Sequence, residues 1–178
     1  MMKELTLDNA KKFAAEKFKS LPRVEQEFNF LHSSYLIEAL EELPHNGITL
    51  VRLRALAWIH DVGKVLGNEN HAEDSLKILE KEFILTEVDK DCILNHGSSS
   101  IPKTKEGMLF RMADGLSLFY PEIAKFVLNK ESEETNDEKA KANFKERYDK
   151  YLKAYSHSSE AIALLERNYK ELNNTEIL

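Results

Sequence analysis

The sequence predicts an all-α protein, and three observations predict it. Apolar residues recur at helical spacing along nearly the whole chain, no segment shows the alternation of a strand, and helix-breaking residues are scarce. The chain has 178 residues with only six Gly and four Pro. This length suits a single domain with a substantial core, so we expect one helical bundle over residues 1–178.

Composition limits the partners that this chain is expected to bind. The net charge of −6 argues against broad electrostatic binding to nucleic acid or to an anionic membrane. A small phosphorylated ligand needs only a local cluster of cations. No apolar run approaches the roughly 20 residues that span a bilayer, and the charged N-terminus lacks the apolar region of a signal peptide. We therefore expect a cytoplasmic protein that binds neither duplex nucleic acid nor membranes.

Its single cysteine, Cys92, lies among apolar residues and is expected to be a buried, inert thiol.

Two amphipathic helices are expected in the first quarter of the chain. Thr6 or Asp8 can cap the first, which runs to about Phe18. After a break at a proline, a longer helix covers about Val24–Leu43. His32 lies beside the apolar stripe of this second helix and is expected to face inward or nearly so.

A central helix follows, capped by Thr49. Its apolar run has no polar face and consists of Leu53, Ala55, Leu56, Ala57, Trp58 and Ile59. A helix of this kind is normally buried. The apolar run ends abruptly on His60 and Asp61, a pair that is costly to bury unless it is hydrogen-bonded or bound to metal. Gly63 is expected to stop the helix, because Gly tolerates the left-handed conformation that ends helices.

Several further helices are predicted, separated by polar loops. One opens at His71, and Thr86 begins another over Glu87–Asn95 with a Thr-x-x-Asp string that only approximates a capping box. That helix ends at His96, and a loop rich in Ser and Lys follows over residues 97–107.

The remaining chain is expected to be helical apart from one connector. Apolar positions mark a buried helix over Met108–Phe119, which carries Asp114. Pro121 opens a short helix, and the polar run Lys130–Asp137 is predicted to be a solvated connector. One or two helices cover about Glu138–Leu172, and their Tyr-rich stripe is predicted to pack in the core, with a dimer face as the alternative.

Polar residues that could bind a metal ion accompany five of the predicted helices: His32, His60, Asp61, His71, His96 and Asp114. Taken singly, each is weak, because a lone His beside an apolar face is commonly a satisfied core residue. A carboxylate such as Asp114 among apolar positions needs a partner. Together, imidazole and carboxylate without thiolate are a ligand set for Mn, Fe, Zn or Co.

The ordered set resembles a known superfamily. The order His…His-Asp…His…His…Asp, with the local strings LHSSYL, IHDVGK, HAEDS, LNHGS and RMADGLS, is similar to the HD-domain metal-dependent phosphohydrolases. The resemblance spans about Phe30–Leu118. It implies a helical bundle of the HD-domain type, with a core of about residues 25–120 and flanking helices at both ends.

The resemblance also implies two divalent metal ions. His32, His60, Asp61 and Asp114 would hold the first ion, while His71 and His96, with Asp61 as a bridge, would hold the second. The alternative for His71 and His96 is contact with substrate phosphate beside a single ion. Mn, Fe, Co and Zn suit these ligands, and Mg is a further candidate.

The implied reaction is hydrolysis of a phosphoester or phosphoanhydride bond in a nucleotide-like substrate by a metal-bound hydroxide. Asp61 is the catalytic carboxylate in this interpretation. Lys64 resembles the family lysine that reaches a substrate phosphate, with a surface lysine at a helix end as the alternative. Arg111 is the best further cation for substrate binding, although a solvated role is favoured for it.

Two other functions are compatible with the same residues. The first is an oxygenase, because some HD-domain proteins use the same six ligands for two irons in oxygen chemistry. The second is a non-catalytic nucleotide-binding regulatory module that keeps the metal only for structure. Among hydrolases, the later motifs resemble those of bacterial diadenosine tetraphosphate hydrolases, but Gly97-Ser98-Ser99-Ser100 stands where those enzymes tend to carry threonines. The sequence leaves open the exact nucleotide, the native metal, a homodimer, and whether residues 97–107 form a lid.

Overall fold

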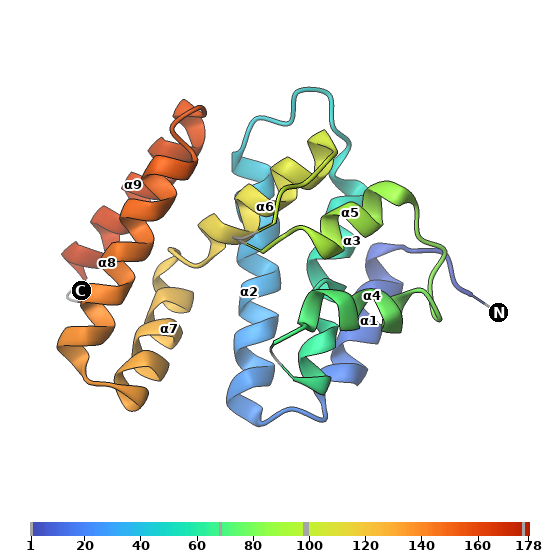
Figure 1. Cartoon of the computed structure of the whole chain (residues 1–178), viewed down its shortest axis with the longest axis horizontal. Helices are drawn as coiled ribbons and strands as arrows, with labels where there is room; N and C mark the ends of the chain where they lie inside the picture. Colours follow the sequence, from blue (N-terminus) through green and yellow to red (C-terminus); the bar gives the residue numbers. More distant parts are fainter. Residues whose placement is uncertain (1, 68, 98–99, 176) are drawn as a thin grey trace. The chain divides into compact units, whose positions relative to one another are not determined.

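The computed structural model describes residues 2–67, 69–97, 100–175 and 177–178. Within them it contains nine α-helices and one 3-10 helix, and the only strand-like pairing there is a single bridge between Lys3 and Phe83 (Figure 1). This confirms the prediction of an all-α fold. In the same described residues, no helix combines the length and the apolar character needed to cross a membrane.

The chain divides into two compact units, residues 1–114 and 115–178. The first contains α1 (Leu7–Phe18), α2 (Arg23–Glu42), α3 (Leu50–Ile59), the 3-10 helix η1 (Val62–Leu66), α4 (His71–Leu79), α5 (Glu87–Leu94) and most of α6 (Lys105–Ser117). The second contains α7 (Pro121–Glu134), α8 (Asp137–Ala154) and α9 (Ser159–Asn174). A single domain over residues 1–178 stays a prediction.

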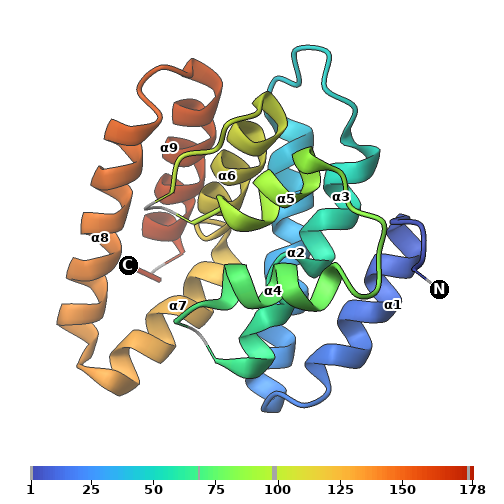
Figure 2. The same cartoon turned by 45° about the vertical axis from the view of Figure 1, so that its right-hand side comes forward.

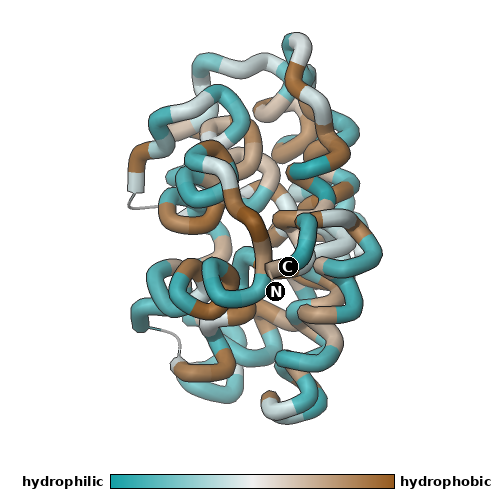
Figure 3. The backbone as a smooth tube through the Cα atoms, turned by 90° about the vertical axis from the view of Figure 1, so that its right-hand side faces the viewer, coloured by the Kyte–Doolittle hydropathy of each residue, from teal (hydrophilic) through white to brown (hydrophobic). Residues whose placement is uncertain are grey.

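Helix α3 forms the centre of the first unit. Its buried residues, as its apolar sequence predicts, are Leu50, Leu53, Ala55, Leu56, Ala57, Trp58 and Ile59. It packs against α1 and α2, and Figure 2 shows these three helices side by side. Brown apolar stretches recur among teal polar ones along the backbone in Figure 3, as expected for amphipathic helices. The helix therefore delivers the residues that follow Ile59 to the interior.

Side-chain caps fix the start of two helices. The Thr6 side chain accepts a hydrogen bond from the Asn9 N–H at 3.3 Å, as the sequence predicts for α1. Thr86 and Asp89 form a complete capping box, since each side chain accepts from the other's backbone N–H, at 3.2 and 2.6 Å. The sequence string only approximates the preferred Thr-x-x-Glu, yet both hydrogen bonds of the capping box are present. Thr49 precedes α3, but its side chain makes no capping hydrogen bond, so that part of the prediction is wrong.

Gly63 has a different role from the one predicted. The central helix does end before it, at Ile59, but Gly63 lies inside η1 and does not have a positive φ angle. Its missing side chain matters instead. A Cβ there would lie 2.1 Å from the backbone oxygen of His71 and 2.5 Å from the backbone nitrogen of Ser75. The Gly63 N–H also donates to the Ser75 hydroxyl at 2.8 Å, so η1 packs directly on the backbone of α4.

Helix α6 begins at Lys105, three residues before its predicted start. The Thr104 hydroxyl accepts a hydrogen bond from the Gly107 N–H at 2.9 Å and donates to the Asp91 carboxylate at 2.6 Å. The same carboxylate accepts from the backbone N–H groups of Lys103 and Thr104, at 3.0 and 2.8 Å. These contacts start the helix within the predicted loop. Ser98 and Ser99 lie outside the described residues, and a lid role for residues 97–107 stays a prediction.

Replacement of Asp91 by alanine is expected to lower the free energy of unfolding by about 1–3 kcal/mol, because several hydrogen-bond donors at the start of α6 would lose a buried acceptor. Asp91→Asn should retain part of this stability, since its amide oxygen can still accept. Urea denaturation of the two variants and the wild type would measure the difference. An unchanged midpoint for Asp91→Ala would contradict the role given to this carboxylate.

Cys92 is fully buried on α5, as predicted. Burial, reinforced by the nearby carboxylates of Asp91 and Asp89, raises the pKa of its thiol far above the ordinary value. The thiol is therefore held in its protonated, unreactive form.

The second unit has a longer first helix than the sequence predicts. Helix α7 continues from Pro121 to Glu134, so most of the predicted connector Lys130–Asp137 is helical. Its residues 130–134 include Lys and three Glu, which are good helix formers. The region 138–172 forms two helices rather than one, with a break before Ser159.

The tyrosines of α8 and α9 pack on one another within this unit. Tyr148 and Tyr169 stack with ring centroids 3.8 Å apart, and Tyr151 and Tyr155 stack at 5.3 Å. The centroid of Phe119 lies 5.7 Å from that of Tyr151. Tyr155 is buried, whereas Tyr148, Tyr151 and Tyr169 are half-buried, so the predicted stripe packs within the unit but is only partly in its core. A homodimer stays a prediction.

Candidate metal centre

The six polar residues singled out in the sequence come together in the first unit. They are supplied by α2 (His32), the end of α3 (His60, Asp61), the start of α4 (His71), the end of α5 (His96) and α6 (Asp114). Their ligand atoms form two groups that share Asp61, and three residues of each group lie close enough together to hold a metal ion.

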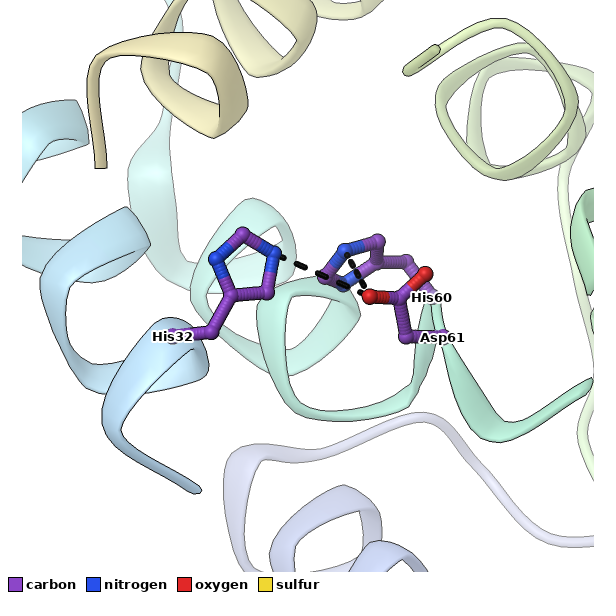
Figure 4. Close-up of side chains that lie close together, drawn as sticks. All are labelled: His32, His60 and Asp61. Atoms are coloured by element: carbon purple, nitrogen blue, oxygen red, sulfur yellow. Dashed lines mark ion pairs between the residues drawn. The ribbon is translucent and has the colours of Figure 1, made fainter. Parts of the chain in front are cut away.

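The first group lies at the inner end of α3. The Nε2 atom of His60 is 3.4 Å from Asp61 Oδ2 and 3.3 Å from Asp114 Oδ1. The Nε2 atom of His32 is 3.7 Å from Asp61 Oδ2 and 3.0 Å from Asp114 Oδ1. Figure 4 shows the rings of His32 and His60 directed toward the same carboxylate oxygen. Two imidazoles and two carboxylates therefore converge from three helices.

The second group faces the other oxygen of Asp61. Asp61 Oδ1 is 3.5 Å from the Nε2 atoms of both His71 and His96, and those two nitrogens are 3.1 Å apart. The Asp61 carboxylate thus presents one oxygen to each group.

Backbone carbonyls fix the orientation of two of the histidines. The Nδ1 atom of His60 lies 3.0 Å from the oxygen of Ala57, and Nδ1 of His96 lies 2.7 Å from the oxygen of Ile93. A carbonyl can only accept, so each Nδ1 carries the proton and donates it. In the neutral ring this leaves the lone pair on Nε2, directed at Asp61, which is the arrangement typical of metal-binding histidines.

The donor set fits a divalent metal ion. His60 Nε2 and Asp61 Oδ1 are buried and have no hydrogen bond within the described residues, although buried polar atoms are normally satisfied. Ligand atoms bound tetrahedrally to Zn²⁺ at its usual distances are about 3.3–3.6 Å apart. The histidine–carboxylate separations here run from 3.0 to 3.7 Å. Metal binding would therefore satisfy both buried atoms with little movement.

Charge in the first group is shared between histidine and carboxylate. Burial alone lowers the pKa of His60, but the carboxylates of Asp61 and Asp114 outweigh burial and raise that pKa to about 10. Burial raises the pKa of Asp61, yet His60 and Lys64 hold it well below its ordinary value. The pKa of Asp114 is lowered likewise, against burial, by His32 and His60. Burial lowers the pKa of His32, and Asp114 offsets only part of that effect. Without metal, His60 is thus the protonated member at neutral pH.

The metal-free protein is expected to be most stable near pH 6.5, because the lowered pKa of His32 costs stability as the pH falls below that value. Because folding raises the pKa of His60 from 6.5 to about 10, its contribution is complete below pH 6.5 and is lost as the pH rises toward 10. Because folding lowers the pKa values of Asp61 and Asp114 from 3.8, their contribution is complete above that pH and is lost on acidification.

Thermal melting in a chelator across this pH range measures the effect. The melting temperature should fall between pH 6.5 and 10, and His60→Gln should remove that fall. Added metal should also remove it, because metal competes with the proton on His60. A wild-type melting temperature that stays level over this range would show that His60 is not protonated.

Lys64 lies at the candidate metal centre, beside Asp61. Its Nζ donates a hydrogen bond to Asp61 Oδ2, and its side chain is 21% exposed. Arg111 lies on α6, one turn before Asp114, and is half-buried. Contact of either residue with a substrate stays a prediction.

Two residues near the metal centre have contacts that the sequence did not predict. Phe28 stacks on His32, and Gly63 allows α4 to approach η1. The spacing of four residues between Phe28 and His32 places them on one helix face and was an available signal. The close approach of Gly63 to α4 could not be predicted from any spacing or motif in the sequence.

A comparison with family models matches residues 31–118 to the HD domain. The match contains all six candidate ligands. Residues 31–118 therefore form a domain of the HD-domain superfamily of metal-dependent phosphohydrolases, as the order of the histidines and aspartates predicts. Neither the curated proteins nor the solved structures contain a significant match to this chain.

Proposed function

We propose that this protein is a phosphohydrolase that uses two divalent metal ions to cleave a phosphoester or phosphoanhydride bond of a small nucleotide-like substrate. The observation that carries the proposal is the position of Asp61, whose two carboxylate oxygens face two separate sets of ligand atoms. A carboxylate in that position is suited to bridge two ions.

The residues of the centre divide by role. His32, His60, Asp61 and Asp114 would hold one ion, and His71 and His96 would hold the other together with Asp61. Divalent ions bound there would lower the pKa of a bound water and offset charge on the phosphoryl oxygens. Mn, Fe, Co and Zn suit the nitrogen and oxygen donors, and Mg is a further candidate.

Exposure differs between the two groups and supports entry of substrate at the second. The His71 side chain is 29% exposed, whereas that of His32 is 6% exposed and that of His60 is 1% exposed. Asp114 of the first group is 17% exposed and His96 of the second is 4% exposed, so His71 has the most exposed side chain of the six candidate ligands. A phosphate would therefore approach beside His71.

Lys64 supplies a positive charge at this centre. Its ammonium contacts Asp61 directly, so a short movement of its flexible side chain would bring it to a phosphate bound to the metal ions that Asp61 would hold. We assign Lys64 to substrate binding, with Arg111 as a further candidate on α6.

A product screen tests the proposal. Protein loaded in turn with Mn, Fe, Co, Zn or Mg would be incubated with nucleoside mono-, di- and triphosphates, dinucleoside polyphosphates and cyclic nucleotides, and products identified by mass spectrometry. Turnover by the wild type that Asp61→Ala lacks would establish hydrolysis at this centre. Absence of turnover with every metal would overturn it. In that case, oxygen consumption by the iron-loaded protein would favour an oxygenase. Tight nucleotide binding without turnover would favour a regulatory module.

A further inference from the structure

We propose that Phe28 is a positioning residue of the metal centre, whose ring holds the Lys64 ammonium and the His32 imidazole beside Asp61. The contact itself is independent of the reaction, whereas its kinetic consequence rests on the proposed phosphohydrolase function. The three elements involved are α2, which carries Phe28 and His32, the end of α3, and η1.

The first contact of Phe28 is with a candidate ligand on its own helix. Residues four apart on a helix lie on one face, and Phe28 precedes His32 by four. Their ring planes are nearly parallel, at 9°, with centroids 5.8 Å apart, which is an offset stack. Phe28 is half-buried, while His32 is buried behind it. The stack restricts rotation of the imidazole whose Nε2 faces Asp114.

The second contact is with Lys64, which comes from a different element. The Lys64 Nζ atom lies 5.7 Å from the centroid of the Phe28 ring, within the range of a cation–π interaction. The same ammonium donates to Asp61 Oδ2. A lysine side chain has a flexible four-carbon stem. Two contacts, one with the Phe28 ring and one with Asp61, therefore restrict the position of the ammonium more than one contact would.

An aromatic ring suits this position because it attracts the ammonium without neutralising it. A carboxylate at residue 28 would pair with Lys64 permanently and would repel a phosphate. The Phe28 ring adds no second carboxylate beside Asp61, so it does not compete with an anionic substrate for the ammonium. One ring therefore orients both a candidate ligand and the candidate phosphate-binding cation.

Substitution at residue 28 separates this role from simple packing. Phe28→Leu keeps apolar volume but removes the aromatic face, and should reduce kcat/KM by about 3- to 30-fold, mainly through KM. Phe28→Tyr keeps the aromatic face and should restore kcat/KM to within about twofold of the wild type. Phe28→Met serves in place of Phe28→Leu if the latter does not fold.

A double-mutant cycle with Lys64→Met shows whether Phe28 acts through Lys64. If it does, Phe28→Leu should have little further effect on KM in the Lys64→Met background. Additive effects would overturn the proposal. Phe13→Leu is the matched control, because the Lys17 ammonium lies 5.2 Å from that ring centroid on α1, and it should leave KM unchanged.

Amine labelling provides a readout that needs no activity. Metal-free wild-type, Phe28→Leu and Phe28→Tyr proteins would be acetylated briefly, and labelling at Lys64 measured by mass spectrometry. Lys11, whose Nζ lies 4.8 Å from the Trp58 ring centroid, is the internal reference. Labelling of Lys64 should increase about 3-fold or more in Phe28→Leu alone. Such an increase in a protein without hydrolytic activity would refute the proposed function and support the positioning role, whereas equal labelling in all three would overturn the role of Phe28.

Discussion

Replacement of Asp61 by alanine is expected to remove both metal ions and to reduce kcat/KM by at least about 10³-fold. Asp61 is the only candidate ligand shared by the two groups, and its oxygens lie 3.4–3.7 Å from the first pair of histidines and 3.5 Å from the second. Without the carboxylate, the first group would keep one acidic ligand and the second would keep none. Elemental analysis of the purified proteins would measure the metal content per chain.

Variants of other residues make this expectation specific. His71→Ala should lose the second ion and keep the first, because His71 belongs to the second group alone. Asp149→Ala removes a surface carboxylate that also pairs with a lysine, and should retain both ions and full activity. An Asp61→Ala protein that still contained two ions per chain would exclude a bridging role for this residue.

The helices and the candidate ligands could be predicted because both depend on patterns within short stretches. The apolar run of α3 predicted a buried helix, and its end at His60 and Asp61 predicted buried polar atoms that need a partner. The remaining four residues were recognised through their order in the chain. The structure places Nε2 of His32, His71 and His96 3.5–3.7 Å from Asp61, and Asp114 Oδ1 3.3 Å from His60 Nε2. Substrate contacts by Lys64 and Arg111 remain predictions.

What the sequence could not predict depends on contacts between distant residues. The early start of α6 results from Asp91, which lies more than ten residues before it and accepts the N–H groups of Lys103 and Thr104. The 3-10 helix η1 follows from its packing on α4 rather than from its own composition. The contact of Phe28 with Lys64 joins two elements that are far apart in the chain.

Replacement of Gly63 by alanine is expected to destabilise the protein by about 3 kcal/mol or more. The new Cβ would lie 2.1 Å from the His71 oxygen and 2.5 Å from the Ser75 nitrogen, and both are backbone atoms of α4. No rotamer change can relieve such overlaps, so α4 or η1 must shift. His71 is the first residue of α4, and we therefore expect the second metal ion to be lost before the first.

Gly97→Ala is the matched control for this substitution. It also adds one methyl group next to a candidate ligand, since Gly97 follows His96. Among the described residues that are not its chain neighbours, the nearest atom would be the Ser100 hydroxyl at an ordinary 3.7 Å. Thermal melting and metal titration of the two variants would separate the effects. Gly63→Ala should melt at a lower temperature and bind the second ion more weakly, while Gly97→Ala should match the wild type. Equal behaviour of the two variants would mean that the close approach of η1 and α4 does not determine where His71 lies.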